Sequence, residues 1–251
     1  MDALVTRAKR ELLIGAAAGR GCGPSLDVGC GAGRYLRHLR EPVVGVDIDR
    51  PLLARLAKEG WPVVLGDAHR LPFRDGAFRT VLFSEVLEHV PEPRKAVGEV
   101  KRVLAKGGRV VLSTPSRRYP FIWDPRNWVR EHQGLPPVRR KTVFTNWTPD
   151  HKRLFTAAEV RQLLAPEIAV ERLRCAGRTA TPVLTAVWLP VYGTWKVAKA
   201  IGLRGLRPIY ERAFQEFVRT ACAEDRVSTA ASPRQGSSEP CLTLIAEGRK
   251  R

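Results

Sequence analysis

Five short apolar runs recur through the first 115 residues, and this spacing constrains the fold more than any other feature of the chain. The runs are rich in Val, Leu and Ile, and they occupy residues 25–30, 43–48, 62–67, 80–85 and 109–114. Runs that are apolar on both faces are typical of parallel strands buried between two layers of helices. Their alternation with helix-forming segments predicts an α/β fold with a doubly wound parallel sheet.

The segments between these runs carry the patterns of helices. Residues 33–40 (GRYLRHLR) and 49–60 (DRPLLARLAKEG) are predicted to be amphipathic helices. In residues 92–108 the apolar side chains recur at helical spacing, and they are Ala96, Val97, Val100, Val103 and Leu104. Gly107–Gly108 predicts the C-terminal stop of this helix.

The regular alternation ends after Pro115, and two irregular segments follow. Residues 116–153 are basic and aromatic, and residues 176–238 mix apolar, basic and loop-forming stretches. A helix over 156–166, a strand over 167–175 and a last strand over 241–248 lie outside them. We therefore expect one core with a basic aromatic insertion at 116–153, a substrate cap, and a lid or membrane-contacting insertion at 176–238. The core is expected in three pieces: residues 1–115, 154–175 and 239–251.

Three glycines, Gly29, Gly31 and Gly33, follow the first predicted strand in the stretch LDVGCGAG, which begins with Leu26 and Asp27. Glycines at the end of a parallel strand let a ligand approach unpaired backbone N–H groups closely. Arg34 stands where the dinucleotide-binding pattern G-x-G-x-x-G needs its third glycine, so the turn differs from that fingerprint.

Acidic residues end the next two predicted strands. Asp47 can accept hydrogen bonds from both hydroxyls of an adenosine ribose, whereas Asp49 is placed to cap the following helix. Asp67 can accept from an adenine amino group, while the backbone N–H of Ala68 donates to a ring nitrogen. A glycine turn and two acids at successive strand ends predict a nucleoside site along one edge of the sheet.

Taken together, these residues resemble the class I S-adenosylmethionine-dependent methyltransferases, in a type 11 or ubiquinone-pathway-like branch. The motifs LDVGCGAG, GVDID and GDAHRLPF carry the resemblance, and FSEVLEHV, RVLAKGGRVVLSTPS and HKRLFTAAEV match later parts of the pattern. The resemblance implies a Rossmann-like sheet of seven strands whose last strand is antiparallel. It also implies S-adenosyl-L-methionine as cofactor, bound by Asp27, Gly29, Gly31, Gly33, Asp47, Ile48, Asp67, Ala68 and Ser84.

Methyl transfer from a sulfonium needs mainly an acceptor held in line, with water excluded. A base is needed where the acceptor proton must leave, and His89 and His151 are our candidates, with Glu85 and Glu88 as further ones. If the segment after residue 84 is helical, Glu85, Glu88 and His89 share one face of it. With His151 they are similar to a metal-binding constellation of the ubiquinone-pathway O-methyltransferases and of enzymes that methylate the 3′ ends of small RNAs. A helix start with a hydrogen-bonded His89 is the alternative, and we assign no metal.

The two insertions are expected to decide the acceptor. Residues 179–195 lack charges and precede four cations, which fits an anionic membrane surface, a lid or a dimer contact. The interleaved arginines and aromatics of 116–153 suit single-stranded RNA or an anionic head group. The net charge of +18 also favours an anionic partner, and five unpatterned cysteines indicate a reducing compartment.

We therefore predict a cytoplasmic methyltransferase, peripheral at the membrane, that acts on a small or lipid-like acceptor. An RNA methyltransferase is the alternative function, and a non-catalytic cofactor-binding protein is the second alternative.

Overall fold

The structure is a computed structural model, and it describes residues 11, 13–15, 17, 23–39, 41–119, 124–138, 151–176 and 243–251. The chain divides into two compact units, and each is described by itself. Unit 1 comprises Met1–Lys9, Arg118–His151 and Cys175–Leu242. Unit 2 comprises Arg10–Arg117, Lys152–Arg174 and Thr243–Arg251.

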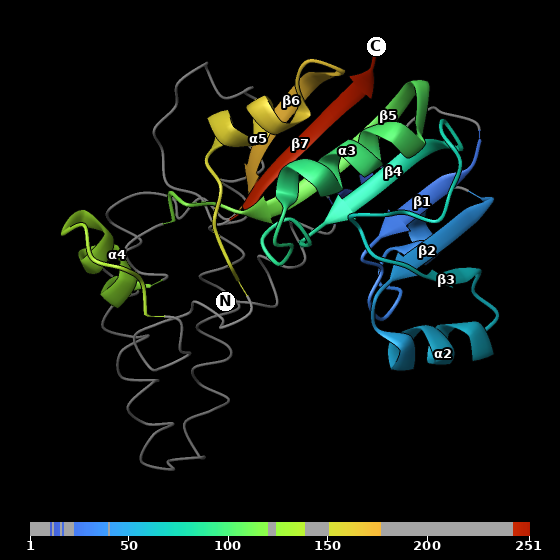
Figure 1. Ribbon diagram of the computed structural model, residues 1–251, viewed down its shortest axis with the longest axis horizontal. Coiled ribbons are helices and arrows are strands. Elements are labelled where there is room, and N and C mark those ends of the chain that lie inside the picture. The colour runs from blue at the N-terminus through green and yellow to red at the C-terminus, as the bar shows by residue number, and fades with distance from the viewer. Residues whose placement is uncertain are drawn as a thin grey trace. The chain divides into compact units, whose positions relative to one another are not determined.

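The described residues form one seven-stranded sheet in the order β3-β2-β1-β4-β5-β7-β6. Its strands are β1 (Ser25–Val28), β2 (Val43–Asp47), β3 (Val63–Leu65), β4 (Phe78–Ser84), β5 (Leu104–Pro115), β6 (Ile168–Ala176) and β7 (Thr243–Lys250). Strands β1 to β5 pair in parallel, and β7 runs antiparallel to β5 (Figure 1). The predicted α/β class, the seven strands and the antiparallel last strand are confirmed.

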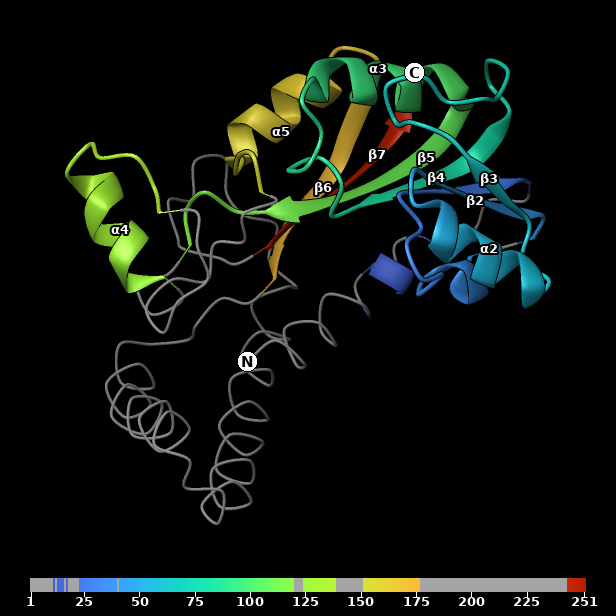
Figure 2. The same ribbon diagram turned by 60° about the horizontal axis from the view of Figure 1, so that its bottom comes forward.

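Helices cover both faces of this sheet. The longer ones are α2 (Arg50–Lys58), α3 (Pro93–Val103) and α5 (Ala157–Leu164), and η1 (Leu36–His38) is a short 3-10 turn. Helices α3 and α5 lie side by side over one face, and α2 lies on the other (Figure 2). Helix α3 buries its apolar stripe on the sheet, as its spacing predicts. In unit 1, α4 (Pro125–His132) is capped by the buried side chain of Asp124.

Two predicted helices differ from the structure. The described part of this segment, residues 33–39, forms only turns and η1, because β2 already begins at Val43 and leaves few residues for a longer helix. Helix α3 ends at Val103, so the predicted stop at Gly107–Gly108 is wrong. The chain enters β5 at Leu104, where pairing with Phe78 satisfies the backbone that a longer helix would have used.

Candidate active site

The turn after β1 uses three glycines in a backbone conformation that other residues rarely adopt. Gly29, Gly31 and Gly33 have φ values of 72°, 52° and 73°. The Gly29 N–H donates to the Val46 carbonyl at 2.8 Å, which ties the turn to β2. The sequence pattern therefore corresponds to a real left-handed turn at the carboxyl end of the sheet.

The three glycines differ in what surrounds them. A Cβ at Gly29 would overlap the Val86 side chain, and one at Gly33 would lie 2.6 Å from Cδ2 of Leu56. A Cβ at Gly31 would meet no atom within 4 Å. Gly29 and Gly33 are thus needed for packing, whereas Gly31 leaves its backbone facing open space that a ligand can enter.

Asp47 ends β2 beside this turn. Its Oδ2 accepts from the Gly31 N–H at 2.8 Å, and its Oδ1 accepts from the Asp49 N–H at 2.9 Å. Asp49 in turn caps α2, accepting from the Leu52 N–H at 3.0 Å, which confirms its predicted role. These two bonds fix the orientation of the Asp47 carboxylate next to the open face of Gly31.

Ile48, between these two acids, is 73% exposed, the most exposed large apolar side chain among the described residues. An apolar group left in water beside a carboxylate is a ready surface for a flat ring. Ala68, which the resemblance also assigns to the cofactor, is buried in the turn after β3.

Asp67 lies in that same turn, and His69 engages it twice. Asp67 Oδ1 accepts from the His69 backbone N–H at 2.9 Å and lies 2.7 Å from the ring atom Nδ1. These hydrogen bonds hold the pKa of Asp67 below its usual range. Nε2 of His69 accepts from the backbone N–H of Glu92 at 3.3 Å.

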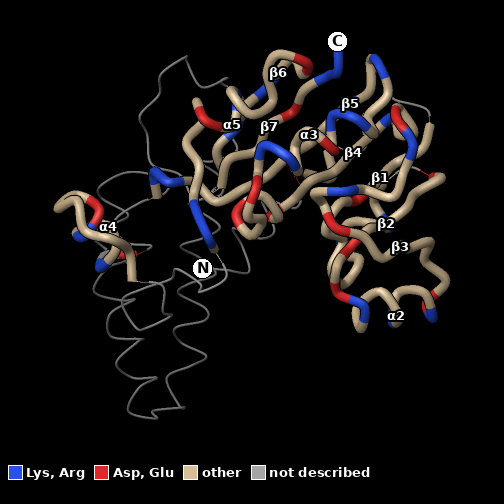
Figure 3. The backbone as a smooth tube through the Cα atoms, viewed as in Figure 1, with Lys and Arg blue, Asp and Glu red and all other residues tan. Residues whose placement is uncertain are grey.

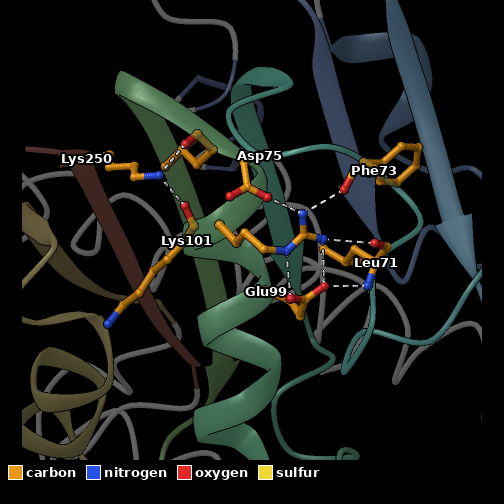
Figure 4. Close-up of polar contacts among 8 residues, drawn as sticks. Leu71, Phe73, Asp75, Glu99, Lys101 and Lys250 are labelled. Atoms are coloured by element: carbon orange, nitrogen blue, oxygen red, sulfur yellow. Dashed lines mark hydrogen bonds and ion pairs between the residues drawn. The ribbon is translucent and has the colours of Figure 1, made fainter.

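Helix α3 anchors the segment that follows His69. The Arg102 guanidinium donates to the carbonyls of Leu71 and Phe73 and to the carboxylates of Asp75 and Glu99, at 2.7–3.0 Å (Figure 4). Glu99 also accepts from the Leu71 N–H at 2.7 Å. All five N–H groups of the guanidinium are used, so the segment is fixed to α3.

Hydroxyl and carboxylate side chains meet where β4 and β5 end. The Oγ atoms of Ser84 and Ser113 lie 2.9 Å apart, and Ser113 Oγ donates to Glu85 Oε1 at 2.9 Å. Thr114 Oγ1 donates to Glu88 Oε2 at 3.2 Å. The structure therefore adds Ser113 and Thr114 to the predicted residues. Their signal in the sequence is the polar pair that ends the apolar run RVVLST.

The segment after β4 is not an α-helix. Glu85 has a φ of 54°, the one positive value of a residue other than glycine among the described residues. Such backbone costs about 1 kcal/mol for an ordinary residue and is often found at functional sites. The expected helical face of Glu85, Glu88 and His89 is therefore wrong, because the left-handed residue turns the chain before residues 87–89 form a single turn.

Glu88 and His89 nevertheless lie together in that turn. The Glu88 side chain is fully buried, whereas His89 is 41% exposed, and His89 Nε2 lies 3.8 Å from Glu88 Oε1. A carboxylate and an imidazole can serve as base and orienting group or as ligands of Mn²⁺ or Fe²⁺.

The segment that enters α5 packs against this turn. Lys152 N–H donates to the Glu88 carbonyl at 2.8 Å, and Arg153 Nη2 donates to the Pro91 carbonyl at 2.8 Å. His151 directly precedes Lys152 but belongs to unit 1. Its assignment as a catalytic candidate stays a prediction.

Asp27 lies beneath the glycine turn and is 1% exposed. Burial raises the pKa of its carboxyl to about 7, and the charge of Asp47 adds to the rise. Its Oδ2 accepts no hydrogen bond from the described residues. This acid is therefore poised to change its charge near neutral pH.

Several predicted features lie partly or wholly outside the described residues. Residues 179–207 and 139–150 are among them, so their expected roles stay predictions. Within the part of the chain that the structure describes, no helix has the length and apolar character to cross a membrane. In unit 2, Lys and Arg are interleaved with Asp and Glu along the backbone (Figure 3).

Comparisons with known proteins agree with this geometry. Residues 26–112 match a family model described as a methyltransferase domain. A demethylmenaquinone methyltransferase of Streptomyces avermitilis is 40% identical over 120 residues, which cover 46% of this chain and 48% of that protein. A probable tRNA methyltransferase 9B of Mus musculus is 33% identical over 113 residues, 43% of this chain and 24% of that protein.

A solved structure shares this fold. A putative methyltransferase of Bacillus halodurans superimposes with a TM-score of 0.55 at 20% identity, covering 97% of this chain and 99% of that one. The alignments to the two curated relatives, by contrast, span about half and about a quarter of those proteins.

Proposed function

We propose that this chain, whose residues 26–112 match a methyltransferase domain, is a class I S-adenosylmethionine-dependent methyltransferase that acts on a small or lipid-like acceptor. The observation that carries the proposal is the pairing of Gly31, open on its Cβ side, with the Asp47 carboxylate that its N–H binds. This pairing offers both a place for the cofactor to approach the backbone and a charged acceptor for its ribose.

The residues along the sheet edge fit S-adenosylmethionine. Asp47 Oδ1 and Oδ2 each take one protein hydrogen bond, and a carboxylate has lone pairs for further donors. Ile48 offers an exposed apolar side chain for the adenine ring, and Asp67 offers a carboxylate at the next strand end. At the ends of β2 and β3, Asp47 is thus assigned to the ribose, Ile48 to the adenine ring and Asp67 to the adenine amino group.

When bound, S-adenosylmethionine supplies a methyl group on a positively charged sulfur that is already a good leaving group. The chain's own residues then have to orient the acceptor and exclude water. The buried hydroxyls of Ser84, Ser113 and Thr114 lie where β4 and β5 end, and β4 pairs with β1, the strand that leads into the glycine turn. In unit 2, His89 is the exposed base candidate, and buried Glu88 is placed to orient its ring.

For the acceptor, a quinone-like lipid is the first candidate. The S. avermitilis relative, whose name gives demethylmenaquinone as its substrate, is more similar and is covered more fully than the tRNA methyltransferase relative. RNA is the second candidate, supported by that second relative. The cytoplasmic location and a contact of residues 179–207 with an anionic membrane are part of the same proposal.

The test uses the purified full chain and methyl-labelled S-adenosylmethionine with two extracts, one of membrane lipids and one of total RNA. We expect label in the lipid fraction. Asp47→Ala should abolish that label, because the ribose loses its acceptor. Asp49→Ala is the matched control. It removes a nearby carboxylate but keeps the backbone N–H of residue 49, which donates to Asp47 Oδ1. This variant should retain most of the labelling.

The outcomes separate the candidates. Asp47-dependent label in RNA alone would replace the lipid acceptor by the second candidate. Binding of S-adenosylhomocysteine without label in either extract would favour a non-catalytic cofactor-binding protein. Equal labelling by Asp47→Ala and the parent chain would contradict the assigned cofactor site.

A further inference from the structure

We propose that His69 is a positioning residue that couples the adenine-side carboxylate of Asp67 to the acceptor-side turn before α3. The inference rests on the proposed function, because Asp67 is taken as the partner of the adenine amino group. His69 itself is not placed against the cofactor. It acts through the orientation of Asp67 and through the backbone of Glu92.

The hydrogen bonds of His69 fix its tautomer. Its Nε2 lies 3.3 Å from the Glu92 nitrogen, which can only donate, so Nε2 is the acceptor. Nδ1 therefore carries the proton and donates to Asp67 Oδ1 at 2.7 Å. The His69 side chain is 11% exposed and the Asp67 side chain is 60% exposed, so the imidazole is held by the protein while the carboxylate faces solvent.

His69 thus bridges Asp67 and Glu92, and both of these residues lie at proposed functional parts of unit 2. Asp67 Oδ1 is occupied by two bonds from His69, which leaves Oδ2 as the oxygen that faces a ligand. Glu92 precedes α3 and follows the turn of Glu88 and His89. Arg153 holds the neighbouring Pro91 carbonyl, so His69 and Arg153 fix this loop at consecutive residues.

This arrangement predicts that the orientation of the Asp67 carboxylate, on the adenine side, depends on the position of the loop before α3, on the acceptor side. A shift of the loop before α3 moves His69 and thereby turns the Asp67 carboxylate. The sequence gives no hint of such a link, because Asp67 and Glu92 are separated by a whole strand.

Two substitutions separate the two bonds. The amide nitrogen of Asn occupies nearly the place of Nδ1, so His69→Asn keeps a donor to Asp67 and loses the link to Glu92. The longer Gln reaches nearly the place of Nε2, so His69→Gln keeps the link to Glu92 and loses the donor to Asp67. Arg70→Ala is the matched control. Arg70 donates its backbone N–H to the backbone carbonyl of Asp67, and the substitution keeps this bond.

Two measurements on the full chain read out the two ends. Calorimetry measures affinity for S-adenosylhomocysteine, and amide hydrogen exchange, without and with that ligand, measures protection of residues 90–95. In the parent chain we expect the ligand to slow exchange of the Glu92 amide. In both variants we expect this ligand-dependent slowing to be lost, because each variant breaks one of the two bonds that join Asp67 to Glu92. The other expectations concern affinity and exchange without ligand. For His69→Gln we expect affinity about tenfold lower, as for the loss of one charge-assisted bond, with protection kept. For His69→Asn we expect affinity within about twofold of the parent and exchange of the Glu92 amide about fivefold faster or more.

Equal effects of the two variants on affinity and on exchange without ligand would overturn the proposal and reduce His69 to a packing residue. A ligand-dependent slowing of Glu92 exchange that is absent in the parent, or that both variants keep, would overturn it as well. So would unchanged affinity and exchange in both variants. Failure of the proposed function has a different signature, since the parent chain itself would then bind no S-adenosylhomocysteine. In that case exchange at Glu92 would still respond to His69→Asn, but the coupling to a cofactor would be refuted.

Discussion

At the scale of single residues, the candidate site consists of backbone groups that glycine exposes and carboxylates that backbone N–H groups orient. Asp47, Asp49 and Asp67 each accept from an N–H within the chain. Such bonds direct the carboxylates before any ligand arrives, which lowers the entropic cost of ordering them on binding. Gly31 exemplifies this pattern and Asp27 departs from it, because Asp27 Oδ2 accepts no hydrogen bond from the described residues.

Gly31→Ala and Gly33→Ala should affect different properties. Both place a side chain at positive φ, which costs about 1 kcal/mol in the free energy of unfolding. Gly33→Ala should cost more, because its Cβ would press on Leu56 of α2. Gly31→Ala should instead weaken S-adenosylhomocysteine binding, because its Cβ enters the open space. Urea unfolding and calorimetry measure the two effects. A Gly31→Ala protein with parental affinity would show that no ligand approaches there.

Asp27 should make the stability of the free protein depend on pH. Its pKa is about 7 in the folded state and 3.8 as the ordinary value, so the unfolded chain loses this proton first. The stabilisation is full below about pH 4 and is lost as the pH rises to 7, by at most about 4 kcal/mol. Urea unfolding across this range should therefore show a steeper decline for the parent than for Asp27→Asn. Parallel curves for the two proteins would contradict the raised pKa.

At the scale of elements, α3 does more than cover the sheet. Its apolar stripe packs on β4 and β5, while Arg102 and Glu99 hold the segment that follows the adenine-side turn (Figure 4). The Lys250 ammonium of β7 donates to the carbonyls of Lys101 and Leu104, where α3 passes into β5. The helix thus connects the candidate site to the antiparallel end of the sheet.

Arg102→Lys should destabilise this element, because a single ammonium cannot replace a planar group that makes five bonds. We expect the free energy of unfolding to fall by about 1–2 kcal/mol. Faster hydrogen exchange in residues 71–75 should accompany the loss. Arg55→Lys in α2 is the control, since its ion pair with Glu59 is exposed and should be nearly neutral. Equal stability of both variants would contradict the anchoring role of Arg102.

At the scale of the whole molecule, strand order decides which residues meet. Strands β1, β2 and β4 are adjacent, so the turns after them lie at one edge although they are far apart in the sequence. β7 is inserted between β5 and β6, which places the C-terminal residues at the centre of that half of the sheet. The candidate site lies in the parallel part of the sheet, at the carboxyl ends of β1 to β4.

Local patterns in the sequence predicted the strands, the presence of helices α2, α3 and α5, and the capping role of Asp49. These depend on local periodicity and on groups a few residues apart, which a linear pattern records directly. The sequence also predicted the carboxylates at the strand ends, because parallel strands always end at the same edge.

The remaining features depend on contacts between segments that are distant in the sequence. The early end of α3 depends on pairing between Leu104 and Phe78, and the loss of the helix after β4 depends on the left-handed Glu85. The contacts of His69, Ser113 and Thr114 join residues 23 to 29 positions apart. Such contacts leave no periodic trace, because they form only when the sheet brings distant strand ends together.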